Sequence, residues 1–207
     1  MKKLSEEDIT KGLHYLFPSP ICELDYTHDY EFLLSVMLSA QTTDKKVNEA
    51  TKPIYEKYNT LEKLSKLSEI EIKEKIKTIG LYSTKAKHFK QIVQTLIELG
   101  GKVPDDRKTL ESMPGVGRKT ASVVLANLYN IPSIAVDTHV YRVSKRLEIT
   151  KEKDDIIKTE EKLKKYFKKD DWNKINSALV LFGRYICTSR NPKCKECPFN
   201  NKCKITK

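Results

Sequence analysis

The chain has 207 residues, with 39 Lys and Arg against 28 Asp and Glu, so its formal net charge is +11. That length allows one large domain or two small ones with a buried core, and an apolar fraction of 39% excludes a disordered chain. No run approaches the roughly 18 apolar residues of a membrane span, and the N-terminus turns acidic at Glu6 where a signal peptide turns apolar. We therefore expect a cytoplasmic protein.

The basic excess predicts an anionic partner. Nucleic acid is the first alternative and an acidic membrane surface the second. A Lys-rich composition without functional meaning stays open at this point.

Helices dominate the predicted structure. The chain has only seven Gly and eight Pro, and few turn-forming residues favour long helices over a many-stranded sandwich or barrel. Apolar residues recur at helical spacing, and no strand alternation is convincing. The sequence therefore predicts an all-α fold. In chain order, we expect helices within 30–40, 61–79, 85–99, 109–113, 118–129, 138–147, 159–167 and 173–186.

The segment Leu110–Ala121 is the most informative part of the chain. A short helix meets a Pro-Gly-Val-Gly turn at 114–117, and a second helix begins at once. Two glycines allow a tight turn and a close approach to a ligand. The exposed amides at the start of the second helix form an anion site that suits a DNA phosphate. This pattern is the helix–hairpin–helix motif; a plain connection between two helices is the alternative.

Lys119 lies in the first turn of that second helix. The helix dipole disfavours positive charge there, and desolvation adds to this effect, so the neutral amine is easier to reach. A neutral lysine amine is a nucleophile that forms Schiff bases. Considered alone, however, Lys119 is more simply interpreted as a lysine that contacts phosphate.

Asp137 ends the buried-looking run Ile134–Asp137 and precedes the helix expected from Thr138. Aspartate at this point is a good N-cap. A carboxylate held here could also deprotonate Lys119 or stabilise positive charge on a sugar. We predict the capping role and keep the catalytic role as a hypothesis.

Four of the five cysteines lie within 17 residues near the C-terminus, with the spacing C-x6-C-x2-C-x5-C. In a cytosolic chain such clustering indicates a metal site and not a disulfide framework. The spacing matches neither a zinc ribbon nor the usual ferredoxin run, so zinc and an iron–sulfur cluster both remain open. The four candidate ligands are Cys187, Cys194, Cys197 and Cys203.

Together these features resemble those of the endonuclease III family, whose members are bifunctional DNA glycosylase/AP lyases. The resemblance is carried by Met113–Ala121, by Val136–Val140 and by the cysteine spacing. It extends to Leu38–Asp44 with Val47-Asn48, and to Gly80–Tyr82 with Lys85-Ala86. It therefore covers nearly the whole chain.

The resemblance implies roles for individual residues. The nucleophilic lysine falls on Lys119 and the catalytic aspartate on Asp137, and the four cysteines would hold a [4Fe-4S] cluster. Gln41 and Leu81 match the positions that enter the DNA stack where the damaged base leaves. The remaining expected DNA contacts are Gly115, Val116, Gly117 and Arg118 in the hairpin, with Lys193 and Lys195 in the cysteine loop.

The resemblance also implies a domain organisation and an activity. A six-helix lobe with the hairpin would span 22–131, and 1–21 with 132–207 would form a second helical lobe with the cluster loop at 187–203. The implied function is base excision repair: removal of oxidised pyrimidines, then cleavage 3′ to the abasic site by β-elimination through a lysine Schiff base. The expected partner is double-stranded DNA with a damaged pyrimidine or an abasic site, and not a membrane. We expect a monomer, nucleoid-associated if the source is prokaryotic.

Three other functions are weighed against this one. An adenine-excising relative of the same fold lacks a lysine at the position of Lys119 and usually carries a further C-terminal domain. A non-catalytic, metal-stabilised DNA-binding module fits the composition and the hairpin equally well. A zinc-finger-like regulator is the third.

The positive charge gathers near the C-terminus, where residues 184–207 contain seven basic residues and one acidic residue. The basic residues are Arg184, Arg190, Lys193, Lys195, Lys202, Lys204 and Lys207. This pattern predicts a phosphate-facing loop around the cysteines.

Overall fold

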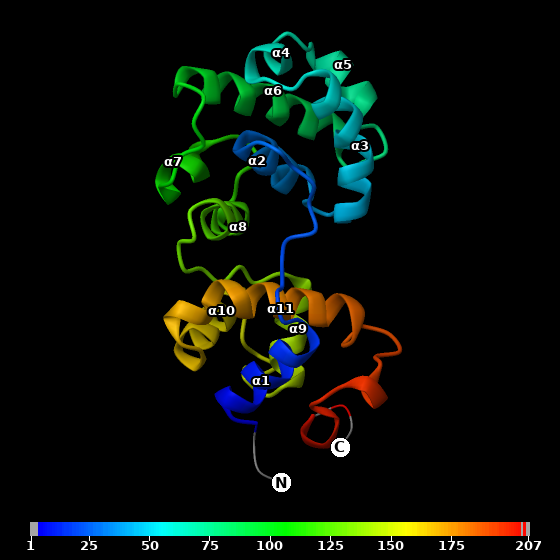
Figure 1. The fold of residues 1–207 in the computed structure, drawn as a ribbon, viewed down its shortest axis with the longest axis vertical. Helices are drawn as coiled ribbons and strands as arrows, with labels where there is room; N and C mark the ends of the chain where they lie inside the picture. The colour runs from blue at the N-terminus through cyan, green and yellow to red at the C-terminus, as the bar shows by residue number, and fades with distance from the viewer. Residues whose placement is uncertain (1–3, 204, 206–207) are drawn as a thin grey trace. The chain divides into compact units, whose positions relative to one another are not determined.

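The computed structural model describes residues 4–203 and 205. The chain forms two compact units. The central unit is Glu23–Tyr129, and the terminal unit combines Met1–Cys22 with Asn130–Lys207. Within the described residues there are helices and no β-strand (Figure 1). The predicted all-α fold is therefore confirmed.

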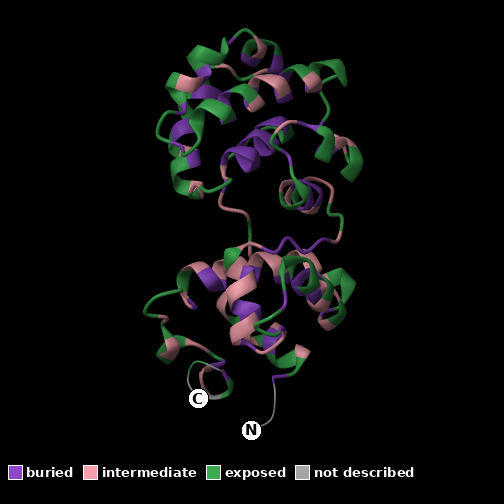
Figure 2. Cartoon of the chain, turned by 180° about the vertical axis from the view of Figure 1, so that it is seen from behind, coloured by how far each residue is buried: buried purple, intermediate pink, exposed green. Residues whose placement is uncertain are grey.

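The central unit is built around a helix that is buried on every side. It contains α2 (Asp29–Leu38), α3 (Asp44–Lys57), α4 (Leu61–Ser65), α5 (Glu69–Lys75), α6 (Tyr82–Glu98), α7 (Arg107–Ser112) and α8 (Arg118–Leu128). Residues 30–38 of α2 are all buried (Figure 2). Helices α3, α6 and α8 pack against α2, which explains why its sequence is apolar nearly all round. The resemblance implies six helices for this lobe, and the structure has seven helices in this unit, of which α4 and α5 are short.

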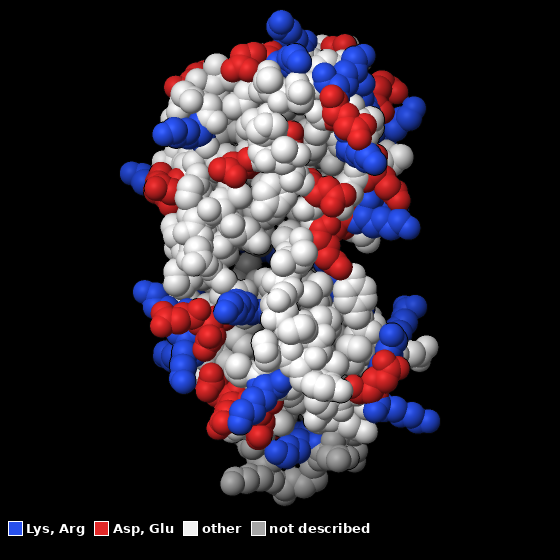
Figure 3. Space-filling model, viewed as in Figure 1, with Lys and Arg blue, Asp and Glu red and all other residues white. Residues whose placement is uncertain are grey.

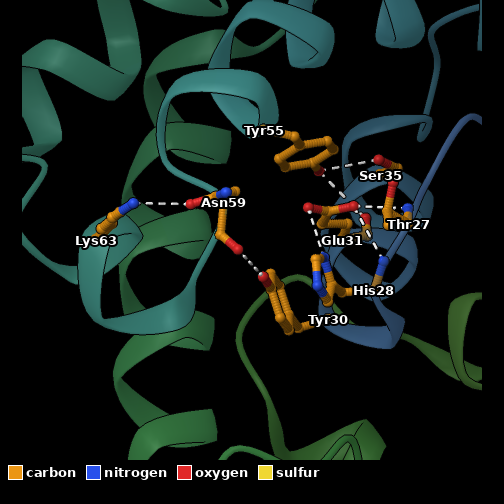
Figure 4. A network of polar contacts seen from close by, with 8 residues as sticks. All are labelled: Thr27, His28, Tyr30, Glu31, Ser35, Tyr55, Asn59 and Lys63. Atoms are coloured by element: carbon orange, nitrogen blue, oxygen red, sulfur yellow. Dashed lines mark hydrogen bonds and ion pairs between the residues drawn. The ribbon is translucent and has the colours of Figure 1, made fainter.

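A polar network fixes the start of α2 (Figure 4). The buried carboxylate of Glu31 accepts hydrogen bonds from the backbone N–H of Thr27 and of His28, at 2.7 and 3.1 Å. The Tyr55 hydroxyl donates to the Glu31 carbonyl at 3.1 Å. Burial raises the pKa of Tyr55, so this phenol stays protonated. The network links α2 to α3 and gives the buried carboxylate hydrogen-bond partners.

The terminal unit is formed by both ends of the chain. It contains α1 (Glu6–Leu16), α9 (Thr138–Arg146), α10 (Ile156–Tyr166) and α11 (Trp172–Tyr185), with short 3-10 turns at Lys169–Asp171, Cys194–Glu196 and Asn200–Lys202. Helix α11 packs against α1 and α9. Their shared core includes Leu13, Val140, Leu179 and Phe182. In Figure 1 the blue α1 and the orange α11 are the two sequence-distant parts of this unit.

Two helices were missing from the sequence-based expectation. Helix α1 begins at a capping box in which Ser5 and Asp8 bond each other's backbone N–H at 3.1 Å. Helix α3 contains Pro53 in its interior. Proline removes a helical hydrogen bond and crowds the preceding turn, so a helix that contains it is difficult to predict from sequence.

No described helix is long and apolar enough to cross a membrane.

Charges of both signs are interspersed on the molecular surface drawn in Figure 3. The net charge of +11 is therefore not a uniform positive coat on this face.

Candidate nucleic-acid interface and cysteine cluster

The turn between α7 and α8 has the expected hairpin geometry. Gly115 has a φ of +77°, a left-handed conformation that favours glycine. The Val116 N–H donates to the Met113 carbonyl at 3.1 Å and closes the turn. Gly117 is the N-cap of α8 and provides no side-chain capping bond. The first amides of α8 are therefore available to an anion.

The hairpin is packed tightly onto the core of its own unit. A Cβ atom at Gly115 would lie 2.5 Å from His88 Nδ1 and 3.2 Å from Met37 Cγ. Only glycine fits between the turn and these residues of α6 and α2. The Val116 side chain is buried, so among the predicted DNA contacts it anchors the turn, whereas Gly115, Gly117 and Arg118 are exposed.

One arginine ties the two helices of the hairpin together. Arg107 Nη1 donates to the Arg118 carbonyl at 3.3 Å and to Glu111 Oε1 at 3.0 Å. Its Nη2 donates to Ser122 Oγ at 3.0 Å. Arg107 carries no signal in the sequence, because its partners are set by the turn that brings α7 onto α8.

Lys119 is exposed in the first turn of α8. Within residues 4–203 and 205, its side chain forms no hydrogen bond or ion pair. Its ammonium is therefore not engaged in holding the central unit together. A lysine with this placement can serve a ligand, either as a phosphate contact or as a nucleophile.

Asp137 caps α9 in the terminal unit. Its Oδ1 accepts hydrogen bonds from the N–H of His139 and of Val140, both at 2.8 Å. The predicted capping role is confirmed. Both bonds use the same oxygen, and among the residues with described structure none is bonded to Oδ2. The carboxylate therefore combines a fixed position with one oxygen, Oδ2, that is unengaged in hydrogen bonding, and it interacts electrostatically with Arg142.

Gln41 and Leu81 lie in neighbouring turns of the central unit. Both have left-handed backbones, with φ of 56° and 60°, which is uncommon for residues other than glycine and is typical of functional positions. A Cβ built on Gly80 would lie 3.8 Å from the Gln41 carbonyl oxygen, so the two turns are adjacent. Leu81 is 62% exposed, although apolar side chains usually pack inward. An exposed apolar side chain beside an exposed amide fits insertion into a base stack.

A buried lysine fixes the Gln41 turn. Lys85 Nζ donates to the carbonyls of Leu38 and Ala40 at 2.8 and 2.6 Å, and to Thr42 Oγ1 at 3.1 Å. Burial lowers the pKa of Lys85. The three oxygen acceptors nevertheless provide one partner for each of the three N–H donors of its ammonium group. Lys85 enters the sequence-based expectation only through the family resemblance, because its partners lie more than 40 residues away in the chain.

The four predicted metal ligands Cys187, Cys194, Cys197 and Cys203 line one cavity. None of them is in a disulfide. Arg146 Nη1 lies 3.4 Å from Cys187 Sγ, so a positive charge stands beside the sulfur that would be a thiolate when a metal is bound. Burial raises the pKa of Cys187 and raises that of Cys197 to about 11. These two thiols are therefore protonated at neutral pH in the absence of metal, and a metal would displace those protons.

The donor set bears on which metal fits. In the described part of the chain, no group of three or more His, Cys, Asp or Glu side chains is placed to hold a metal ion. Four cysteines nevertheless share one cavity with apolar walls that include Leu147 and Phe182. A cavity lined by four cysteines fits a group that thiolates bind, either a zinc ion or an iron–sulfur cluster.

The cysteine loop is docked on its own unit by an aromatic side chain. Phe199 is buried and contacts Phe182 edge to face, with ring centroids 5.5 Å apart. It lies over Gly12 of α1, where a Cβ would be 2.4 Å from the Phe199 ring. Lys202 Nζ lies 3.3 Å from Asp8 of α1. The predicted DNA contacts Lys193 and Lys195 are exposed. Lys204 and Lys207 lie outside the described residues.

Comparison with known proteins identifies the family. The sequence profile of the HhH-GPD superfamily, described as base excision DNA repair proteins, matches residues 34–169. Endonuclease III of Bacillus subtilis (strain 168) is 44% identical over 190 residues, which are 91% of this chain and 87% of that protein. The chain belongs to the endonuclease III family of base excision DNA repair enzymes. Endonuclease III of Escherichia coli (strain K12) is 40% identical over 98% of this chain and 96% of its own length.

Solved structures agree with this assignment. A non-covalent endonuclease III–DNA complex is 39% identical, covers 98% of this chain and 97% of its own, and has a TM-score of 0.91. A trapped endonuclease III–DNA covalent intermediate gives a TM-score of 0.90 at the same identity. The predicted resemblance to endonuclease III and the predicted class of base excision repair enzyme are confirmed.

Proposed function

We propose that this member of the endonuclease III family is a bifunctional DNA N-glycosylase and AP lyase that uses Lys119 as its nucleophile. The observation that carries the proposal is Lys119 itself, exposed and unengaged at the start of the helix that follows the DNA-binding hairpin. The solved relative trapped as a covalent DNA intermediate supports a covalent mechanism for this family.

The reaction begins when the damaged pyrimidine leaves the duplex, at a cost of a few kcal/mol that the damage itself lowers. The neutral Lys119 amine attacks the sugar C1′. A bond from Nζ to C1′ forms as the bond to the base breaks, and the base leaves with the electron pair and takes a proton. The adduct loses a proton from nitrogen as the sugar ring opens, which gives a Schiff base.

Strand cleavage follows from the Schiff base. The iminium acidifies the C2′ protons, and loss of one of them expels the 3′ phosphate by β-elimination. Water then releases Lys119 from the product. The Asp137 carboxylate stabilises the positive charge that develops on the sugar. Its unengaged Oδ2 supplies this function while Oδ1 caps α9.

The remaining predicted site residues bind the DNA. The amides at Gly115, Gly117 and Arg118 bind a phosphate at the start of α8, and Val116 anchors that turn. Leu81 fills the space left by the extruded nucleotide, and the Gln41 amide bonds the orphaned base. Lys193 and Lys195 add phosphate contacts beside the cysteines. The partner is duplex DNA with an oxidised pyrimidine or an abasic site, bound by a monomer.

The four cysteines would hold a [4Fe-4S] cluster, which supplies structural cross-linking when bound and no step of the reaction. Cys187, Cys194, Cys197 and Cys203 provide the four thiolates, and Arg146 beside Cys187 offsets their charge. Iron analysis and visible absorption of the purified protein test this assignment. About four irons and a brown colour are expected; a colourless protein with one zinc would contradict it.

Borohydride trapping tests the central proposal. Reduction of the Schiff base gives a covalent complex between the protein and a duplex with an abasic site. We expect Lys119→Ala to abolish this complex, and Lys66→Ala, an exposed lysine of the same unit, to leave it unchanged. Trapping that persists without Lys119 would assign the nucleophile elsewhere. Absence of trapping in the native chain would favour a non-catalytic DNA-binding module.

A further inference from the structure

The segment that leads to Asp137 is buried but belongs to no helix or strand. Ser133, Ile134, Ala135 and Val136 are all buried, and residues 130–137 have no regular secondary structure. Backbone N–H groups in such a segment need partners, because a buried unpaired donor is costly. The partners found here come from side chains of α11.

Two asparagines of α11 accept these hydrogen bonds. Asn176 Oδ1 accepts from the Ala135 N–H at 3.0 Å. Asn173 Oδ1 accepts from the Ser133 N–H at 2.9 Å, and its Nδ2 donates to Asn130 Oδ1 at 3.3 Å. Alternate residues of the segment are thus bonded by residues three apart on the helix. Side chains with that spacing lie on one helical face, so α11 replaces the missing neighbouring strand.

The same helix also fixes the far side of Asp137. A Cβ at Gly183 would lie 2.7 Å from His139 Cβ, so α9 rests directly on α11 just after its N-cap. Arg142 of α9 donates to the Gly183 carbonyl at 2.7 Å. Asn173, Asn176 and Gly183 share one face of α11. Asp137 is therefore held from the segment before it and from the helix after it.

We infer that Asn176 is a positioning residue for Asp137: through the Ala135 N–H it sets where the unengaged carboxylate oxygen of Asp137 stands during base removal. The inference rests on the proposed function, because it needs Asp137 to act in the reaction. Nothing requires Asn176 to touch DNA. If Asn176 acts only by positioning Asp137, its effect on the rate of base removal disappears when Asp137 can no longer act.

The test measures single-turnover base removal from a duplex with thymine glycol in four proteins: native, Asn176→Leu, Asp137→Asn and the double variant. We expect Asn176→Leu to slow base removal about tenfold to a hundredfold, because small displacements of a reacting group have effects of that size. DNA affinity is expected to change less than about twofold. In the Asp137→Asn background, followed over long time courses, Asn176→Leu is expected to slow the residual reaction less than about twofold.

Two further variants separate positioning from folding. Asn176→Asp keeps an acceptor for the Ala135 N–H and is expected to restore the native rate to within about threefold. Asn127→Leu is the matched control: it is the same substitution at an exposed asparagine whose Nδ2 donates to the Val123 carbonyl of its own helix. We expect it to leave the rate unchanged. Amide hydrogen exchange over 131–137 is expected to speed up in Asn176→Leu and not in Asn127→Leu.

Equal slowing by Asn176→Leu with and without a functional Asp137 would overturn the inference, as would a native rate in Asn176→Leu. If Asn176→Leu fails to fold, the comparison is made with Asn176→Ser, whose shorter hydroxyl cannot reach as far, and the same two outcomes decide. A native chain that does not remove the base overturns the proposed function instead, and the hydrogen-exchange result still reports whether Asn176 holds the segment.

Discussion

Gly12 shows how one hydrogen atom can decide the docking of a loop. The Phe199 ring occupies the space that a side chain at residue 12 would need, and a Cβ atom there would also lie 3.3 Å from Pro198. That Cβ would lie 2.4 Å from the Phe199 ring, so any side chain at residue 12 would force the ring to move. Phe199 is the buried residue that attaches the cysteine loop to α1 and α11. The loop therefore depends on a residue almost at the other end of the chain.

We expect Gly12→Ala to lower the free energy of unfolding by about 1–3 kcal/mol, the usual cost of overpacking. Urea unfolding measures this loss. Gly80→Ala is the control, because a Cβ there meets its nearest atom at an ordinary 3.8 Å, and its stability is expected to stay near native. Equal stability of Gly12→Ala and the native protein would contradict the close packing of Phe199.

Asp137 has two roles that one pair of substitutions can separate. Asparagine offers the same Oδ1 to the N–H groups of His139 and Val140, so Asp137→Asn is expected to keep native stability while single-turnover base removal falls about 10²–10⁴-fold. Asp137→Ala loses the cap as well and is expected to cost about 1 kcal/mol of stability. Thermal unfolding and base removal are measured on both variants. Native activity in Asp137→Asn would restrict Asp137 to capping.

The residues that sequence reasoning found and missed differ in how their partners are specified. Asp137 was identifiable because its capping partners are the next residues of the chain. Asn176 and Gly12 were not, because their partners lie 41 and 187 positions away and depend on helix packing. Chemistry that is local in the chain can be predicted from local patterns, whereas long-range contacts of an ordinary Asn or Gly leave no local signal.

At the scale of elements, α6 organises the proposed DNA contacts of the central unit. Leu81 is its N-cap, Lys85 in its first turn holds the Gln41 turn, and His88 lies against Gly115 of the hairpin. The sequence predicted this helix from residue 85, and the structure begins it at Tyr82. The difference arises because the N-cap is Leu81, which has a left-handed backbone conformation and makes no side-chain capping bond. Leucine is not among the residues that mark the start of a helix in a sequence.

We expect Lys85→Met to lower the free energy of unfolding by about 1–3 kcal/mol, because the carbonyls of Leu38 and Ala40 lose their donor. Base removal is expected to slow as well, since the Gln41 turn is no longer fixed. Lys87→Met is the matched control, on the same helix but exposed. If Lys85→Met and Lys87→Met behave alike in urea unfolding and in base removal, the anchoring role of Lys85 is wrong.

At the scale of the whole molecule, the fold class could be predicted because helix periodicity and scarce turn residues are global signals. The helix count of the central unit could not, because α4 and α5 contain only five and seven residues and short helices depend on packing for their stability. Helix α3 could not be predicted either, because Pro53 in its interior is unfavourable in a helix. The exposed state of Lys193 and Lys195 could be anticipated, whereas the burial of Val116 inside the hairpin turn could not.

The distribution of charge over the molecule leads to a last prediction, on salt dependence. Lys193 and Lys195 flank Cys194 in the docked loop and are exposed, whereas Lys202 in the same loop pairs with Asp8. If both exposed lysines contact phosphate, each releases counterions on binding. The slope of log affinity against log salt is then expected to become about two units shallower in Lys193→Ala/Lys195→Ala. Filter binding or fluorescence anisotropy between low and moderate salt measures it.

The control removes the same amount of charge elsewhere. Lys63→Ala/Lys66→Ala takes two exposed lysines from α4 and its C-cap, so the net charge falls equally while the cysteine loop is untouched. We expect its salt slope to stay native, because counterion release follows local contacts and not total charge. If both double variants shift the slope equally, DNA senses the net charge of +11 as a whole; a shift in the loop variant alone assigns the phosphate contacts to the cysteine loop.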